Sequence, residues 1–506
     1  MTPRPTRRGF IQAAAGTTLY GLADLAFLSK LGPVSAADTK LDSNLARVQP
    51  DIEPLVRLLE NTPRAKLLEE VAFRIRNGLT YREVLTALLL AGVRSIQPRP
   101  VGFKFHAVLV VNSAHLASLN SPDEHRWLPI FWALDNFKNS QAQNDAQGGW
   151  RQKPVDEVNV PSARKAKKAF VEAMANWDEA AADVAAAGMA RGLGVQEAFT
   201  LFARVGCRDF RDIGHKAIYV ANAFRTLQCI GWQYAEPVLR SLGYALLEHS
   251  GDNPAKRDDP ADRPGRLNLA RLPKLPEGWR EGKPDEGAVA EMLATVRDGS
   301  DQDSCNKVME LLGKGVAPQS IWDGLLNSAG EMLMRQPGIV GLHTLTTANA
   351  LRYSYEASAG EDRALLMLQC AAFMPMFHNA MKGRKEAIAD LRIDKLEPRI
   401  PKGDSLTPAQ IFADVGKDRA AAAASTLGFL KSGGDAKSLI DTARVLVFLK
   451  GSDSHDYKFS SAVLEDYYHV SPVFRDRYLA ANTYWLKGSS AKDNELVKRS
   501  RAALKA

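Results

Sequence analysis

The histidines are the residues of this chain whose types and spacing best predict chemistry. Nine occur in 506 residues, and four stand at the same place in four similar segments, where an apolar helical pattern begins; they are His106, His215, His343 and His455. Neutral imidazole is the commonest side-chain ligand for Zn, Cu, Fe and Ni, and it is also an acid or base near neutral pH. If the segments pack about one axis, the four rings converge, and we expect a transition-metal or haem site with His215 and His343 as catalytic residues.

A structural role for the same histidines is the alternative. A ring in the first turn of a buried helix can bond a neighbouring loop carbonyl, and a duplicated segment would inherit that bond four times. Rings that point into separate apolar interiors or into water would then carry no chemistry. The distance between the rings separates the two interpretations, because metal–nitrogen bonds are only about 2 Å long.

Polar residues follow two of the histidines along their predicted helices. Asn222 with Arg225, and Asn349 with Arg352, lie two to three turns further on, in segments that share the order Ala-Asn-Ala-(Phe/Leu)-Arg. An asparagine can orient a ligand or bind a substrate carbonyl, and an arginine can hold an anion through two parallel hydrogen bonds. We therefore expect these four residues to line a small-molecule site.

The elements that position these residues are predicted to be helices. Long segments rich in Ala, Leu, Glu, Lys and Arg have apolar residues three and four positions apart, and alternating β-type runs are almost absent. In each segment one helix ends at a glycine and another starts soon after, and Thr80 with Glu83 predicts a capping box at the first of these junctions. The sequence therefore predicts an all-α protein of four diverged helical repeat units, packed as an arc, a ring or a pseudo-symmetric bundle. The units span residues 45–138, 162–250, 285–391 and 406–490.

Several function classes lack support in the sequence. The formal net charge of +8 is spread along the chain without a basic tract, so nucleic-acid binding is not expected. The chain has no His-Glu-x-x-His, no Gly-x-Ser-x-Gly and no P-loop, which are the marks of common hydrolases and nucleotide-binding proteins. The widely spaced cysteines lie in apolar helical patterns, which favours buried thiols over disulfides; they are Cys207, Cys229, Cys305 and Cys370.

The first residues of the chain predict export. The segment 6–12, Thr-Arg-Arg-Gly-Phe-Ile-Gln, matches the twin-arginine consensus, and Val34-Ser35-Ala36 is a small-residue cleavage signal. Residues 1–37 are therefore predicted to be a signal peptide read by the Tat translocase, which places the mature protein in the periplasm. No later window approaches the roughly 20 apolar residues that a membrane span needs, so no stable span is expected.

Two stretches, Gly214 to Leu247 and Gly341 to Phe373, resemble helical segments of the questin oxidase-like family, in which histidine starts a helix that ends in Ala-x-Arg. The tandem histidines near a His-Pro element that are typical of that family are missing here. The resemblance implies an all-helical oxidoreductase that acts on an aromatic or polyketide-like compound. The segment 78–83, Gly-Leu-Thr-Tyr-Arg-Glu, is similar to helix starts of carboxymuconolactone decarboxylase-like proteins, although their redox Cys-x-x-Cys is absent.

These observations favour an exported metal- or haem-dependent oxidoreductase with a small organic substrate, an aromatic one if the family resemblance holds. Twin-arginine export adds to this hypothesis, since it is often used by proteins that acquire a cofactor before they cross the membrane. The competing hypothesis is a non-enzymatic helical-repeat protein that binds a ligand or a protein partner on its inner surface. The sequence identifies neither the substrate, nor the metal, nor the oligomeric state.

Overall fold

The computed structural model describes residues 45–400 and 406–505, and these residues form helices joined by turns and loops. Within these ranges the only β-type pairing is an isolated bridge between Lys283 and Val316. The prediction of an all-α protein is therefore confirmed. The predicted signal peptide, residues 1–37, lies outside the described residues.

The helices follow one another in four groups. The first group is α2 (Glu53–Asn61), α3 (Arg64–Arg76), α4 (Tyr81–Ser95), α5 (His106–Leu119) and α6 (Leu128–Ala146). The second is α7 (Ala163–Asn176), α8 (Glu179–Gly192), α9 (Val195–Gly206), α10 (His215–Ile230) and α11 (Ala235–Leu246), followed by α12 (Arg263–Arg271). The third is α13 (Glu286–Asp298), α14 (Asp301–Gly313), α15 (Pro318–Arg335), α16 (Ile339–Ala357) and α17 (Asp362–Lys382). The fourth is α18 (Pro408–Asp414), α19 (Arg419–Lys431), α20 (Ala436–Lys450), α21 (Ser454–Asp466) and α22 (Pro472–Asn482), followed by α23 (Glu495–Lys505).

In each group the fourth helix carries one of the four predicted histidines. These helices are α5, α10, α16 and α21. The common order is compatible with four diverged units, and a fourfold duplication stays a prediction. The first group reaches further than expected, because α6 continues to Ala146, past the boundary predicted at residue 138.

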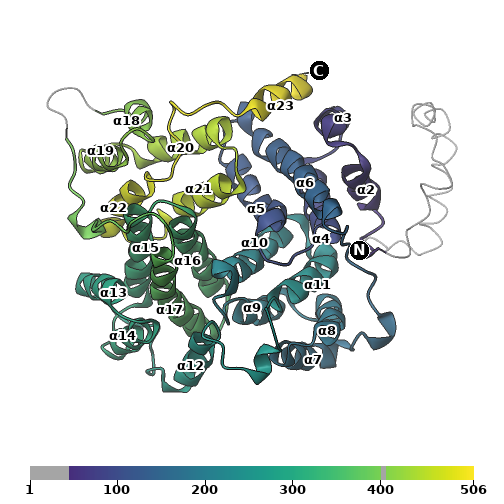
Figure 1. Ribbon diagram of the computed structural model, residues 1–506, viewed down its shortest axis with the longest axis horizontal. Helices are drawn as coiled ribbons and strands as arrows, with labels where there is room; N and C mark the ends of the chain where they lie inside the picture. Colours follow the sequence, from purple (N-terminus) through teal and green to yellow (C-terminus); the bar gives the residue numbers. More distant parts are fainter. Residues whose placement is uncertain (1–44, 401–405, 506) are drawn as a thin grey trace, which may run out of the picture. The chain divides into compact units, whose positions relative to one another are not determined.

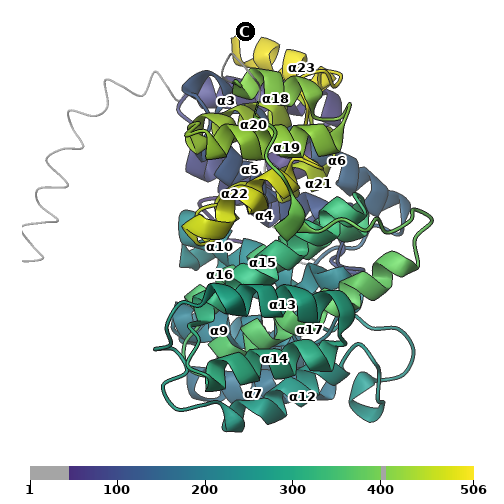
Figure 2. The ribbon, with the colours of Figure 1, turned by 90° about the vertical axis from the view of Figure 1, so that its left-hand side faces the viewer.

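The four histidine helices pack against one another in a closed cycle. Helix α5 contacts α10 and α21, and α16 contacts the same two helices. Figure 1 shows the four side by side, with the remaining helices around them. The next layer includes α6 against α5, α9 against α10, and α15 and α17 against α16. Figure 2 shows α22 between α15 and α19, and it contacts both.

The position of these helices makes them buried on almost every side. In α5 only Leu116 and Leu119 are not buried. A helix that is apolar around its whole circumference is typical of the middle of a large protein. Polar side chains in such a helix need partners, so any that lack them mark a candidate site.

The helix junctions follow the sequence prediction at the first unit. Gly78, with φ of 102°, closes α3. The Glu83 carboxylate accepts hydrogen bonds from the backbone N–H and the hydroxyl of Thr80, at 2.8 and 2.7 Å. The capping box at the start of α4 is therefore confirmed, and Glu83 serves the helix terminus rather than a reaction.

Helix α17 is the one described helix that is long and apolar enough to cross a membrane, so the prediction that no window after the signal peptide approaches a membrane span is wrong for this helix. Inside the protein, 78% of its apolar window is buried. Figure 2 shows it next to α13 and α14, and it contacts both. These are the surroundings of a core helix.

The four cysteines are free thiols, three of them buried and Cys229 half-buried. Burial raises the pKa of every one of these thiols. A thiol with a raised pKa is a poor nucleophile, so none of the four is a candidate for thiolate chemistry.

Candidate metal centre

The structure brings the four predicted histidines together at one point. One potential ligand atom from each of His106, His215, His343 and His455 lies within 4.8 Å of all the others. The Nε2 atom of His215 is 2.9 Å from Nε2 of His106 and 3.0 Å from Nε2 of His343. The ring of His455 completes the group, with its centroid 4.5 Å from that of His106. His215 and His343 are buried, His343 with no exposed surface, and His455 is half-buried.

Each ring enters the centre from the beginning of its helix. His106 and His215 are the first residues of α5 and α10, and His455 is the second residue of α21. His343 differs, because α16 begins four residues earlier, at Ile339. The sequence placed all four at helix starts, and the extra turn of α16 is a finding of the structure.

The outer nitrogen of each ring is held by an oxygen atom. Nδ1 of His106 lies 2.9 Å from the Phe103 carbonyl oxygen, and Nδ1 of His215 lies 2.5 Å from that of Asp212. Nδ1 of His343 lies 2.6 Å from the Ile339 carbonyl oxygen. A carbonyl oxygen only accepts hydrogen bonds, so these three Nδ1 atoms must carry the proton and donate it. In a neutral ring Nε2 is then unprotonated, and its lone pair is free to bind a metal.

The fourth ring has a carboxylate in the same position. Nδ1 of His455 lies 2.5 Å from Oδ1 of Asp453, which also accepts the backbone N–H of His455. Metal-binding histidines almost always donate their other N–H to a carboxylate or a carbonyl in this way. The sequence prediction of a structural bond to a neighbouring loop carbonyl is thus correct for His106 and His215, whereas His343 bonds the first carbonyl of its own helix and His455 a carboxylate. In all four rings Nε2 remains available to a ligand.

The Nε2 atoms face one another without a proton between them. Burial is the first cause that holds the pKa of His106, His215 and His343 well below 6.5, and the charge of Lys458 adds to it. Neutral rings that donate through Nδ1 place lone pair against lone pair at 2.9 and 3.0 Å. This contact is repulsive unless a cation lies between the rings. The donor set therefore fits a bound metal ion.

The spacing fits one ion better than a haem. Bonds of about 2.0–2.1 Å place two nitrogens of one metal about 2.9–3.4 Å apart at bond angles between right angles and tetrahedral. The two shortest separations, 2.9 and 3.0 Å, agree with this range. A haem iron already has the macrocycle nitrogens around it and takes protein ligands only on its axis. Four imidazoles around one point leave no space for that ring.

The turns that hold two of the rings are strained. Phe103, Asp212 and Ile213 have φ of 46°, 53° and 46°, in the left-handed region that costs an ordinary residue about 1–2 kcal/mol. Phe103 and Asp212 are the residues whose carbonyls accept from the His106 and His215 rings. Strain of this kind clusters at functional sites, where the surrounding structure maintains it.

Gly102, next to Phe103, offers a test of that turn. Its φ of 140° and ψ of −156° lie in a region that is nearly exclusive to glycine, and an added Cβ would contact the His215 ring at 3.6 Å. We expect Gly102→Ala to lower the free energy of unfolding by about 1–3 kcal/mol and to weaken metal binding. Urea unfolding of the metal-free protein and a metal titration measure the two effects.

The matched control for this substitution is Gly194→Ala. Gly194 has an ordinary φ of −66° and open space around its Cβ position. Alanine is expected there to leave stability within about 0.5 kcal/mol or to raise it slightly. Equal effects of the two substitutions would contradict a strained turn beneath the histidines.

A small cavity, called here the inner cavity, lies between the four histidine helices. It is lined by Asn112, Asn222, Arg225, Asn349, Lys458 and Ser461, among others. Three of the four polar residues predicted to line a site are in this set. Asn222 Nδ2 donates to the Leu109 carbonyl at 2.8 Å, and Asn349 Nδ2 donates to Glu465 Oε2 at 2.8 Å.

Arg352, the fourth, does not line the inner cavity. Its guanidinium bonds Gln319 Oε1 at 2.9 Å and Glu356 at 2.7 Å. Arg225 lies ten residues after His215 and Arg352 lies nine residues after His343, but the two asparagines differ by the same one residue and both line the inner cavity. The partners of Arg352 on α15 and α16 hold its side chain away from the inner cavity.

Lys458 is a residue of this region that the sequence reading missed. It lies on α21, one turn after His455, and only 2% of it is exposed. Its Nζ has no hydrogen-bond partner, and burial lowers its pKa to about 7. A signal was present, since Leu109 and Ile218 occupy the same position, three residues after their histidines. A lysine in a column of mainly apolar residues is unusual.

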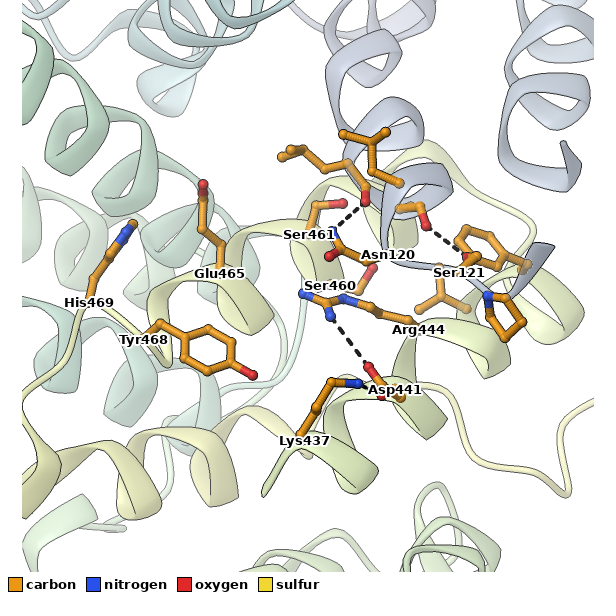
Figure 3. Close-up of a pocket in the computed structure, with 16 residues that line it drawn as sticks. Asn120, Ser121, Lys437, Asp441, Arg444, Ser460, Ser461, Glu465, Tyr468 and His469 are labelled. Carbon is orange, nitrogen blue, oxygen red and sulfur yellow. Dashed lines mark hydrogen bonds and ion pairs between the residues drawn. The ribbon is translucent and has the colours of Figure 1, made fainter. Parts of the chain in front are cut away.

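A larger hollow, called here the outer pocket, adjoins the inner cavity. Its volume is about 760 Å³, and Leu116 and Ser461 line both spaces. Figure 3 shows Arg444 and Lys437 on one side of the outer pocket, and Glu465, Tyr468 and His469 on the other. A path from the outer pocket towards the centre would therefore pass Leu116 and Ser461.

No protein-family model, curated protein or solved structure matches this chain, so its function has to be inferred from the site geometry.

Proposed function

We propose that the four histidines bind a single transition-metal ion and that the protein is a metal-dependent oxidoreductase acting on a small organic substrate. The observation that carries the proposal is the arrangement of the ring nitrogens. Three Nδ1 atoms donate to carbonyl oxygens, the fourth faces the Asp453 carboxylate, and Nε2 atoms of neighbouring rings approach to 2.9 and 3.0 Å without a proton between them. A bound cation removes that repulsion.

The donor set supports a redox metal. Imidazole suits Fe, Cu, Ni and Zn, and when bound such an ion supplies Lewis acidity or electron transfer. The four ligands are neutral and the Lys458 ammonium lies nearby, so only the Asp453 carboxylate behind His455 compensates part of the charge of the ion. Such surroundings favour the less charged, reduced state and so make the oxidised state a stronger oxidant.

The lining of the inner cavity argues against metal-assisted hydrolysis. Its described residues include no aspartate or glutamate, and zinc peptidases of the His-Glu-x-x-His type use such a carboxylate to activate water. In this proposal His215 and His343 act as ligands rather than as acid–base catalysts. Asn222, Arg225 and Asn349 bind and orient the substrate.

Two further expectations belong to the same proposal. The resemblance of residues 214–247 and 341–373 to the questin oxidase-like family supports an aromatic or polyketide-like substrate. The twin-arginine motif supports periplasmic location and export after the metal has been inserted. The competing hypothesis, a non-enzymatic binder, keeps one supporting feature, the outer pocket of about 760 Å³.

Metal analysis of the protein purified from its native host tests the proposal. We expect about one Fe, Cu or Ni ion per chain, with a visible or electron paramagnetic resonance signal that changes on reduction. Protein that contains only zinc would contradict an oxidoreductase and leave the metal site intact. Folded protein that is metal-free and takes up none of these ions would contradict the metal site itself.

A further inference from the structure

Three buried polar atoms without hydrogen-bond partners belong to side chains that line the inner cavity. They are Nζ of Lys458, Nε of Arg225 and Oδ1 of Asn112. Buried polar groups are nearly always paired, because an unpaired one loses its hydration without compensation. Three such atoms around one cavity indicate a ligand that supplies their partners.

The charges around the inner cavity indicate that this ligand is an anion. The Arg225 guanidinium is paired with Glu465 Oε2 at 2.8 Å and lies 4.1 Å from the centre of the Tyr353 ring. The Lys458 ammonium has no such partner, and no described residue of the lining is a carboxylate. A buried ammonium is normally paired, so the cavity lacks one negative charge.

The volumes of the inner cavity and the outer pocket indicate a ligand with two parts of different size. The inner cavity has a free volume of about 10 Å³, about the space of one water molecule, so only a small group enters it. The outer pocket, which shares Leu116 and Ser461 with it, holds about 760 Å³. A molecule with a small anionic head and a larger organic body matches the two spaces.

We propose that the inner cavity binds one carboxylate oxygen of a small organic acid, with Lys458 Nζ and Arg225 Nε as donors, while the rest of the acid occupies the outer pocket. Asn112 Oδ1 remains as an acceptor for a hydroxyl group or a water carried with the ligand. The proposal rests on the proposed function only where it names this acid as the substrate of the metal centre. The binding itself needs protein groups alone.

Calorimetric titration of the full chain with formate and with benzoate tests this inference, in both the metal-free and the zinc-loaded protein. Formate can place one oxygen in the inner cavity and carries no organic body, whereas the ring of benzoate needs the outer pocket. We expect both to bind, and Lys458→Met to weaken both by about 10- to 100-fold, because a hydrogen bond to a charged group is lost. Lys168→Met is the matched control, since this lysine lies on α7, lines neither of the two spaces and has its side chain 82% exposed. It should leave both affinities unchanged.

Leu116→Trp tests the route between the two spaces. A larger side chain at the shared wall should weaken benzoate binding and spare formate. Benzoate affinity equal to that of the wild type would overturn the outer pocket as the site of the organic body. Binding of formate without benzoate would also overturn it, in favour of a free small oxyanion.

Stability separates a ligand role of Lys458 from a structural one. Methionine fills a similar volume and removes an unpaired buried charge, so Lys458→Met should raise the melting temperature while anion binding is lost. Unchanged anion affinity in this variant, or no binding of either anion to the wild type, overturns the inference. Lys458-dependent anion binding by a protein that takes up no metal would overturn only the proposed function. Metal uptake without anion binding would overturn only this inference.

Discussion

Replacing His215 with alanine is expected to abolish stoichiometric metal binding. Its Nε2 lies 2.9 Å from that of His106 and 3.0 Å from that of His343, so this nitrogen is close to two of the other ligands. Loss of an outer-shell partner costs about 10- to 100-fold in metal affinity, and loss of a direct ligand should cost more. Metal content after dialysis against a weak chelator measures the effect.

The difference in stability between metal-loaded and metal-free protein distinguishes a ligand from a structural histidine. Free metal at about a thousand times its Kd stabilises a protein by about 4 kcal/mol. We expect this gap in the wild type and its near absence in His215→Ala. His378→Ala is the control, because His378 lies on α17 outside the cluster, and the gap should persist there. A gap that survives in His215→Ala would contradict the metal centre.

The sequence predicted the components of the centre better than their arrangement. Four histidines in one column, together with helix-type apolar spacing, predicted the elements and the ligands. The closed cycle of α5, α10, α16 and α21 depends on packing between segments that lie more than a hundred residues apart in most cases. Local periodicity shows which residues share a helix face, but it does not show which other helix will meet that face.

The two arginines predicted to line the site show the same limit of sequence-based prediction more clearly. Arg225 and Arg352 both follow an asparagine by three residues, so the sequence predicted that both would line the small-molecule site. Arg225 reaches Glu465 across the histidine helices, whereas Arg352 finds Glu356 on its own helix and turns away from the inner cavity. The carboxylate within reach of each guanidinium determines this outcome, and a motif comparison that aligns the asparagines does not show it.

Lys458 was missed for a different reason. A lysine on a predicted helix is usually solvated, and only the packing of α21 against α5 and α16 makes this one buried. An alignment of the four segments on their histidines, compared three residues further on, would have singled out this lysine. Buried polar atoms without hydrogen-bond partners identify Lys458 as a candidate ligand-binding residue, and only a three-dimensional structure reveals such atoms.

Acid is expected to destabilise the metal-free protein steeply below pH 6.5. Burial holds the pKa of His106, His215 and His343 well below that value, whereas in the unfolded chain each ring takes up a proton near 6.5. The unfolded state therefore binds more protons than the folded state in this range, and stability is lost as the pH falls. Each ring contributes about 1.4 kcal/mol per pH unit, and three contribute about 4.

Two other groups shape this profile without reversing it near pH 6.5. Burial lowers the pKa of Lys458 to about 7, so the free energy that its protonation costs the folded state has almost fully accumulated by the time the pH falls to 6.5. Lys458 therefore adds little slope below pH 6.5. The pKa of Asp212 is raised to about 6, chiefly by burial. The folded state gains a proton there below about pH 6, which offsets the slope of one histidine. The slope is therefore expected to grow as the pH falls below 6.5 and to approach that of two histidines, about 3 kcal/mol per pH unit, below about pH 6.

Urea unfolding of the metal-free protein at closely spaced pH values measures this slope, and His343→Gln identifies its source. Glutamine cannot take up a proton, so the variant should lose about 1.4 kcal/mol per pH unit of the slope. In the metal-loaded protein the ligand nitrogens must stay unprotonated, so metal release should follow the same direction of pH. A flat profile in the wild type, or an unchanged slope in His343→Gln, would mean that the rings take up protons in the folded state as readily as in the unfolded chain. That outcome would contradict buried rings that stay neutral and offer their Nε2 lone pairs to a cation.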